Sequence, residues 1–260
     1  MTSLALGLAV MVIVMAALWL LQRRTGNAGV VDVGWSAGVG IVGVLAAALG
    51  AGSPPRRLLV GVMIALWSLR LAIYILRRVL GEPEDGRYTR LRAEWGAAAQ
   101  RRLFFFYQAQ AVLAALFALP VWVVAADARP GWGAHELAAV LVWLIAVAGE
   151  SLADRQLARF RSDPANRGRT CSSGLWHFSR HPNYFFEWVH WWAYVVLALG
   201  APLWWLTLAG PALMLFFLLK VTGVPATEAR ALLSRSDYAE YQRTTSAFIP
   251  WFPRRPATRG

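Results

Sequence analysis

The sequence predicts an all-α polytopic membrane protein with seven transmembrane helices, an outer N-terminus and a cytoplasmic C-terminus. Three observations predict this fold class: the composition, seven apolar segments and the distribution of arginine. Hydrophobic residues make up 58% of the 260 residues and charged residues only 15%, whereas soluble domains usually have about 25% charged residues. This composition excludes disordered and collagen-like chains. A single cysteine, Cys171, can form no intrachain disulfide.

The predicted helices follow the apolar segments, because a helix needs about 20 apolar residues to cross the hydrocarbon core. Residues 4–21 have no basic leader or small-residue cleavage site and are followed by Arg23 and Arg24, so they predict a first membrane helix and not a signal peptide. Breaks rich in glycine and proline at 51–57, 127–133 and 200–202 are typical of turns. The predicted helices cover approximately 2–21, 30–50, 58–78, 103–126, 136–154, 184–200 and 203–221.

The distribution of arginine along the chain predicts the orientation of the helices in the membrane. With the N-terminus outside, the inner segments hold 22 of the 26 Lys and Arg residues. Basic residues gather on the cytoplasmic side of membrane proteins, so we expect an integral protein of the bacterial cytoplasmic membrane. The net charge of +12 is then explained by anchoring to the inner face and not by nucleic acid. Residues 227–248 predict a cytoplasmic tail helix. The inner segments are 22–29, 77–102, 153–183 and 220–260.

Two glycine motifs in the second predicted helix are interpreted as packing features. Gly38–Gly43 fits the dinucleotide-binding pattern and Gly34–Gly38 fits the nucleophile elbow. The first pattern requires a strand followed by a helix, and the second requires a strand-to-helix turn with Asp and His partners. Both motifs lie inside one apolar helix, where small residues allow close helix packing.

Charged residues inside the predicted helices are candidates for function, because a charge in a bilayer costs at least about 2.5–3.5 kcal/mol. All of them fall in the predicted cytoplasmic half, which indicates a polar cavity open to the cytosol. The alternative is ion pairing between helices, for example of Asp32 or Glu187 with Arg70. The charged residues are Asp32, Arg70, Glu150, Asp154 and Glu187.

Helical spacing arranges the polar residues in two stripes. Asn183, Glu187, His190 and Tyr194 share one helix face, and Glu150, Asp154 and Arg161 follow a similar course on the preceding helix. Guanidinium groups bind phosphates in a bidentate manner, so the arginines around the cavity indicate a nucleotide cofactor. We expect no metal site, because Pro182 interrupts the His177–His181 spacing and no carboxylate completes a ligand set. The rim arginines are Arg77, Arg78, Arg87, Arg155, Arg161, Arg169 and Arg180.

Three C-terminal segments carry a family resemblance: "ADRQLARFR" (153–161), "GLWHFSRHPNYFFEW" (174–188) and "TGVPATEARALLSRSDYAEYQRTTSAFIPWFP" (222–253). They resemble the steroid 5-alpha-reductase superfamily, most closely its bacterial members. The N-terminal half matches more weakly, at 30–35 and 66–78. The resemblance implies a seven-helix enzyme that uses NADPH to reduce the activated C=C bond of an enone, such as a 3-oxo-delta4 steroid or a similar lipid. It implies one membrane domain, with the substrate side in 1–102 and the cofactor-binding half in 103–260.

The resemblance also implies cofactor-binding residues. Asn183 and Glu187 match positions that hold the nicotinamide end, and Asp154 and Arg161 match positions near the ribose and phosphates. Family members have Asn in place of Glu150 and His in place of Arg230. The remaining expected cofactor-binding residues are Arg87, Arg169, Arg180, His181, Tyr184 and Tyr241.

On the substrate side, the animal steroid enzymes polarise the ketone with a Glu on helix two and a Tyr on helix three, near which this chain has Asp32 and Trp67. An indole cannot replace a phenol as proton donor, so the expected catalytic residues are Asp32 and a tyrosine donor, Tyr88 or alternatively Tyr74. Asp32 could donate only if burial kept it protonated. The expected substrate-binding residues are Trp35, Trp67, Arg70 and Tyr74.

Two alternative functions remain. Membrane methyltransferases acting on isoprenylcysteine or phospholipid share an "RHP-x-Y" element and an acidic tail helix, and their S-adenosylmethionine would also occupy a cytosolic cavity. A non-enzymatic lipid- or sterol-binding protein is the third reading. Asn183 followed by Glu187, together with "ADRQ", favours the reductase. We expect a monomer whose partners are a lipophilic enone and membrane lipid.

Overall fold

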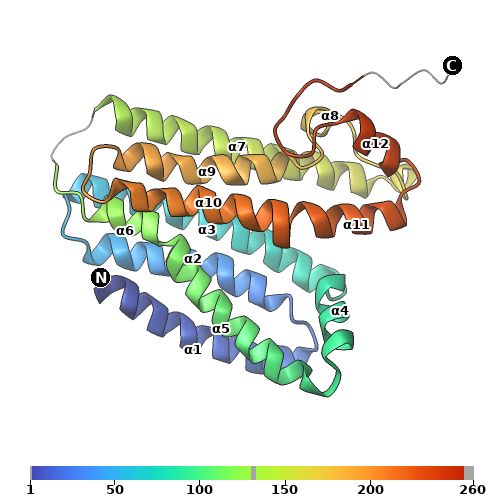
Figure 1. Cartoon of the computed structure of the whole chain (residues 1–260), viewed down its shortest axis with the longest axis horizontal. Helices are drawn as coiled ribbons and strands as arrows, with labels where there is room; N and C mark the ends of the chain where they lie inside the picture. The colour runs from blue at the N-terminus through green and yellow to red at the C-terminus, as the bar shows by residue number, and fades with distance from the viewer. Residues whose placement is uncertain (1, 130–132, 255–260) are drawn as a thin grey trace. The chain divides into compact units, whose positions relative to one another are not determined.

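The computed structural model describes residues 2–129 and 133–254, and throughout this part of the chain the regular structure is helical, with no strand. Six helical segments are long and apolar enough to cross a membrane: Thr2–Thr25, Val30–Leu49, Pro54–Gly81, Gly86–Ala125, Ala134–Ser162 and Trp204–Ser234. These segments confirm an all-helical chain of membrane-protein character. The remaining predicted span forms the 17-residue helix α9 (Pro182–Ala198), which is not among the six (Figure 1).

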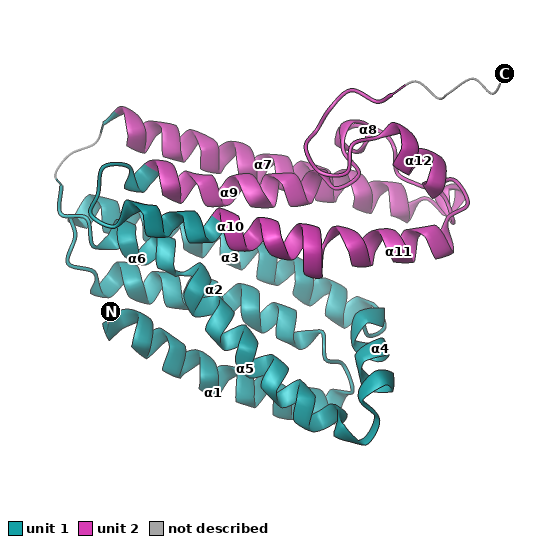
Figure 2. Cartoon of the chain, viewed as in Figure 1, with its two compact units in different colours: residues 1–133, 197–210 teal, residues 134–196, 211–260 magenta. Residues whose placement is uncertain are grey.

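The chain divides into two compact units, coloured separately in Figure 2. Unit 1 comprises residues 1–133 and 197–210, and unit 2 comprises residues 134–196 and 211–260. The boundary at residue 133 differs from the division at residue 102 that the sequence suggested. The reason is that α5 (Ala99–Phe117) packs against α1 (Thr2–Thr25) and α2 (Val30–Leu49) and so belongs with the N-terminal helices.

Unit 1 differs from the predicted helices at three places. α3 (Pro54–Gly81) begins at the proline pair, because proline is tolerated in the first turn. The predicted inner loop contains α4 (Gly86–Trp95), which Asp85 caps by accepting a hydrogen bond from the Arg87 amide. The predicted helix over 103–126 is divided at Ala118 into α5 and α6 (Leu119–Ala125), since Pro120 lacks an amide proton for a continuous helix.

The glycines of α2 allow close helix packing, which confirms the interpretation of its two motifs. A Cβ atom added to Gly34 or Gly38 would lie 2.3 Å from Leu18 and 2.2 Å from Met11 of α1. On another side, a Cβ atom on Gly40 would lie 2.2 Å from Ser68 Oγ of α3. The glycines therefore bring three helix backbones together.

A buried ion pair joins the first turn of α3 to the loop that follows α6 in unit 1. Arg56 Nη1 lies 2.9 Å from Asp127 Oδ2, and both side chains are almost fully buried. Arg56 also donates to the Leu197 carbonyl, and Arg129 donates to both Asp127 and the Leu199 carbonyl. Burial alone would raise the pKa of Asp127, but its bonds with Arg129 and the charge of Arg56 lower it.

Unit 2 is built on α7 (Ala134–Ser162) and α9. A Cβ atom on Gly149 of α7 would lie 2.5 Å from the Phe186 ring of α9, so the two helices meet there closely. On another side of α9, Trp188 Nε1 donates to the Pro211 carbonyl of α10. The other elements are α8 (Leu175–Phe178), α10 (Ala209–Phe216), a π-helical turn (Phe217–Val221), α11 (Val224–Ser234) and α12 (Tyr238–Thr244). The tail expected as one helix is thus α11 and α12.

Candidate functional site

The polar stripes predicted on two helices meet in unit 2. Asn183, at the start of α9, donates from Nδ2 to Asp154 Oδ1 of α7 across 3.2 Å. Glu150, one turn before Asp154, and Glu187, one turn after Asn183, are buried with exposed fractions of 4% and 7%. The structure therefore brings together four of the residues predicted to line a cofactor site.

Asn183 retains an unused acceptor. Its Oδ1 atom is shielded from solvent and accepts no hydrogen bond from any residue that the structure describes. A buried polar atom without a partner costs free energy, and such atoms are uncommon in native proteins. A ligand that offers an N–H or O–H group would satisfy this oxygen.

The stripe on α9 continues into the apolar interior of unit 2. His190 and Tyr194 are fully buried, and His190 Nε2 lies 3.0 Å from the Tyr194 hydroxyl. His190 also contacts Trp191, with the rings edge to face. Of the predicted stripe, Glu187, His190 and Tyr194 are thus buried, and the last two lie within hydrogen-bonding distance of each other.

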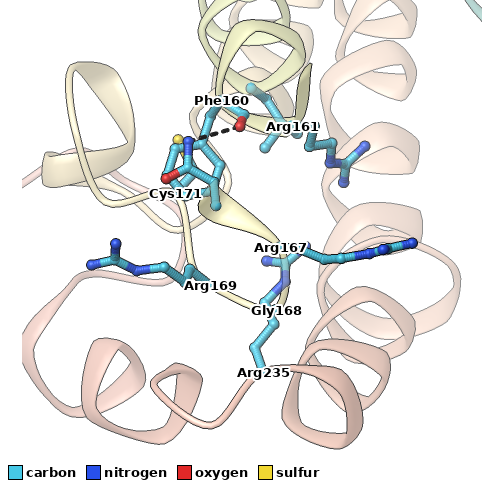
Figure 3. Close-up of a pocket in the computed structure, with 9 residues that line it drawn as sticks. Phe160, Arg161, Arg167, Gly168, Arg169, Cys171 and Arg235 are labelled. Carbon is cyan, nitrogen blue, oxygen red and sulfur yellow. Dashed lines mark hydrogen bonds between the residues drawn. The ribbon is translucent and has the colours of Figure 1, made fainter. Parts of the chain in front are cut away.

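An arginine-lined hollow lies at the end of α7 (Figure 3). Its volume is about 140 Å³, and no carboxylate lines it. Figure 3 shows the guanidinium groups of Arg161 and Arg167 on one side of the loop and that of Arg169 on the other. The lining residues are Leu157, Phe160, Arg161, Asn166, Arg167, Gly168, Arg169, Cys171 and Arg235.

The hollow is electropositive. Burial and the like charge of Arg161 lower the pKa of the Arg235 guanidinium. Burial also raises the pKa of the Cys171 thiol, which favours its neutral form. Concentrated positive charge of this kind suits an anion with several oxygen atoms, such as a phosphate.

Arg167 and Arg235 were missed by the sequence prediction, whereas Arg161 and Arg169 were identified. Arg167 belongs to the same short loop as Arg169, so its clustering with other arginines was a visible signal. Arg235 lies far along the chain, between α11 and α12. Asp237 brings this segment to the loop by accepting hydrogen bonds from the amide and the hydroxyl of Thr170.

Two residues predicted to bind the cofactor also hold the C-terminal tail in place. Arg180 donates to Glu228 Oε1 at 2.7 Å and to the backbone carbonyls of Gln242 and Thr245. The buried Tyr241 hydroxyl donates to the carbonyls of Trp176 and Ser179. The hydrogen bonds of Arg180 and Tyr241 thus tie residues 176–180 to the C-terminal tail, and we call this set of contacts the clamp.

His181 and Tyr184 belong to the same clamp. His181 is 2% exposed, and its Nε2 lies 3.2 Å from Glu228 Oε1. The Tyr184 ring stacks on the His181 ring, and its hydroxyl lies 3.1 Å from Thr227 Oγ1. Arg230, on the same helix as Glu228, is exposed to solvent and does not line the hollow.

The predicted catalytic pair forms a polar cluster in unit 1. The Tyr88 hydroxyl donates to Asp32 Oδ1 at 2.8 Å, and Arg87 Nη2 lies 3.0 Å from Asp32 Oδ2. Asp32 therefore accepts hydrogen bonds from both Tyr88 and Arg87. Arg87 also pairs with Asp85, so its guanidinium contacts two carboxylates of the chain. Burial would raise the pKa of Asp85, but Arg87 lowers it.

The predicted substrate residues also lie in unit 1. Trp35 contacts Trp67 and Phe117 edge to face, with ring centroids 6.5 and 5.3 Å apart. Trp67 is fully buried, and Tyr74 is 37% exposed. Arg70, on α3 between these two residues, is half-buried. Trp35 and Trp67 thus contribute to an aromatic core in α2 and α3.

Among the described residues, no group of three or more His, Cys, Asp or Glu side chains is arranged to hold a metal ion. No curated protein and no solved structure matches the chain. One family model does match, over residues 18–245, and its description is "Protein of unknown function (DUF1295)". That range includes α2 to α12, and with them the Asp32–Tyr88 cluster of unit 1 and the two polar stripes of unit 2. The chain therefore belongs to the DUF1295 family of proteins of unknown function.

Proposed function

We propose that this protein is an NADPH-dependent membrane reductase that transfers hydride to the activated C=C bond of an enone, a 3-oxo-delta4 steroid or a similar lipid. The observation that carries the proposal is the combination of two features in unit 2. The buried Oδ1 atom of Asn183 accepts no hydrogen bond from the described residues, and an arginine-lined hollow lies further along α7. The likeness of residues 174–188 to steroid 5-alpha-reductases supports it, as does the association of the DUF1295 family with such membrane proteins.

The residues present fit NADPH. Its nicotinamide carboxamide offers an N–H donor for Asn183 Oδ1, and its phosphates suit Arg161, Arg167 and Arg235. Along α7, Asp154 and Arg161 are separated by about 10 Å at a rise of about 1.5 Å per residue. An elongated ligand with an uncharged head and an anionic tail matches this order of polar and basic groups.

Bound NADPH would supply a hydride equivalent to the beta carbon of the enone. The residues of the chain would orient the cofactor and stabilise charge. Asp154 fixes the Asn183 amide, so that its free oxygen is held ready for the ligand. Glu150 and Glu187 are buried, which indicates that this part of unit 2 is shielded from bulk water.

On the substrate side, Tyr88 is the group in unit 1 that we assign to the carbonyl oxygen of the enone. Its hydroxyl can turn from Asp32 toward that oxygen by rotation about the C–O bond, and Arg87 would continue to hold the Asp32 carboxylate. A donor aimed at the oxygen on which negative charge develops lowers the barrier of the reaction.

The proposal includes the predicted topology, in which α9 also crosses the membrane, which makes seven crossings, and the C-terminus is cytoplasmic. α9 contacts Gly149 of α7 and Pro211 of α10. Each of these two residues lies in a candidate membrane span. Fusing a fluorescent protein or alkaline phosphatase to the C-terminus tests this orientation. We expect fluorescence with the first reporter and no phosphatase activity with the second.

The function is tested by purifying the protein in mild detergent and identifying the bound small molecules by mass spectrometry. NADP(H) is expected. S-adenosyl compounds would instead indicate the methyltransferase alternative, and their presence without NADP(H) would refute the reductase. Oxidation of NADPH should then be followed with a panel of steroid and fatty enones, and failure of every enone would refute the substrate class.

A further inference from the structure

The C-terminal segment 248–254 displays an unusual apolar surface. Ile249, Trp251 and Phe252 are 59%, 71% and 76% exposed, although none of them belongs to a helix. Exposed apolar clusters of this kind mark contact with a partner or with a membrane. Arg254 follows directly and is also exposed.

The backbone of this segment is held in place. The Trp251 amide donates to the Phe178 carbonyl at 2.9 Å, and the Ser179 hydroxyl donates to the Phe248 carbonyl at 2.8 Å. The Arg254 amide donates to the Thr244 carbonyl at 2.8 Å. The apolar side chains are therefore presented by an anchored strap, defined here as residues 248–254.

The strap lies against the first turns of α9. Phe248 contacts Phe185 and Trp188, with ring centroids 5.9 Å away in both cases, and Phe252 contacts Phe178 at the same distance. The strap therefore packs against the segment from Phe178 to Trp188 and lies at the same height along α9 as its first turns.

This level is also where α7 changes from apolar to charged. Residues 137–149 contain no charged residue, whereas Asp154, Arg155 and Arg159 follow. The Asn183–Asp154 hydrogen bond places the start of α9 beside this change. In a membrane-spanning helix such a change marks the boundary between hydrocarbon and headgroups.

We propose that the strap inserts Ile249, Trp251 and Phe252 into the headgroup region of an anionic bilayer. Aromatic side chains prefer this region, and a neighbouring arginine is attracted by anionic lipid. The strap would then fix the depth at which α9 enters the membrane. This inference requires that unit 2 spans a membrane but not that it binds NADPH, so its test does not depend on the proposed activity.

Site-directed spin labelling tests the proposal in lipid nanodiscs. The only cysteine, the buried Cys171, is replaced by alanine, and one new cysteine is introduced as Trp251→Cys. Ile249→Cys is a second probe position in case the first variant misfolds. Ser236→Cys, exposed between α11 and α12, is the matched control. We expect labels at 251 or 249 to be more accessible to oxygen than to a water-soluble nickel complex, and the label at 236 to show the reverse.

The dependence on lipid charge provides a second readout. Adding phosphatidylglycerol to phosphatidylcholine nanodiscs should move the label at 251 deeper, and Arg254→Gln, which leaves Arg255 in place, should reduce this difference. Nickel accessibility at 251 and 249 equal to that at 236 would overturn the proposal. So would dipolar coupling between labels of two copies, which would indicate a dimer contact. A depth independent of phosphatidylglycerol would overturn the preference for anionic lipid.

Discussion

Asn183 donates its amide proton to Asp154 across 3.2 Å, and this hydrogen bond joins the two polar stripes of unit 2. Because Asp154 accepts from Nδ2, the Asn183 side chain is held with Oδ1 available to a ligand. The pair therefore works as one element, in which α7 sets the orientation of a group on α9.

Replacing Asn183 with alanine removes this acceptor and the hydrogen bond from Asn183 to Asp154. Loss of such hydrogen bonds costs about 1–3 kcal/mol, so we expect NADPH to bind about 5- to 150-fold more weakly. Binding is measured by titration calorimetry in detergent. Asn27→Ala in unit 1, where the amide donates to the Val79 carbonyl, is the matched control. Equal affinities of the two variants would exclude a cofactor role for Asn183.

Arg235→Gln should weaken NADPH binding without destabilising the ligand-free protein. The charge of Arg161 repels that of Arg235 in the hollow and contributes to the lowered pKa of Arg235. Removing one charge relieves this repulsion but also removes a phosphate partner worth about 1.5–3 kcal/mol. We expect an unchanged or higher Tm without NADPH and a smaller increase in Tm with NADPH.

The control for this experiment is Arg243→Gln, which changes an exposed arginine paired with Glu240 on α12. It should leave the NADPH-dependent increase in Tm intact. If both variants respond to NADPH as the unaltered protein does, the hollow is not a phosphate site.

Tyr88→Phe separates chemistry from cofactor binding. The hydroxyl is the donor assigned to the enone oxygen, and removing one such donor typically lowers kcat about 10²–10³-fold. We expect that loss in kcat with unchanged affinity for NADPH, measured by enone-dependent NADPH oxidation. Tyr107→Phe is the matched control, because its buried hydroxyl donates to the Ala28 carbonyl. A kcat of Tyr88→Phe equal to that of the control would refute the assignment.

The fold was predictable where one physical requirement dominates. Apolar length identified the long helices, and the small residues of α2 indicated close packing, which the contacts of Gly34 and Gly40 confirm. α4 was missed because its charged sequence lacks apolar periodicity, although Asp85 provided a capping signal. The break at Ala118 depends on Pro120, a residue that can either kink or end a helix.

The candidate site was only partly predictable, because a motif does not distinguish residues that bind a ligand from those that hold a loop. Arg180 and Tyr241 lie in matching segments, yet both bind backbone carbonyls of the chain itself. Arg235 reaches the hollow only through the tertiary contact of Asp237 with Thr170, which no sequence spacing reveals.

Arg180→Lys tests the structural role of the clamp. Lysine keeps the charge but cannot reproduce the guanidinium fork that reaches Glu228 and two carbonyls. Breaking a buried charge pair costs about 3–5 kcal/mol when one partner is removed, so retaining the charge should limit the loss to about 2 kcal/mol. We expect a lower Tm but an unchanged affinity of the folded protein for NADPH. A selective loss of affinity at constant Tm would instead restore the phosphate role.

The clamp should also respond to pH through His181. Burial lowers the pKa of His181 below its ordinary value of 6.5, although Glu228 opposes this effect. The unfolded chain therefore binds the proton more readily than the folded one, and the free energy of unfolding falls as the pH drops below about 6.5. We expect a Tm that decreases between pH 7.5 and 5.5, and a weaker decrease for His181→Gln. His135→Gln, in which a half-buried histidine beside Glu136 is replaced, is the control and should keep the full decrease. A decrease of the same size in His181→Gln would assign the pH dependence to other groups.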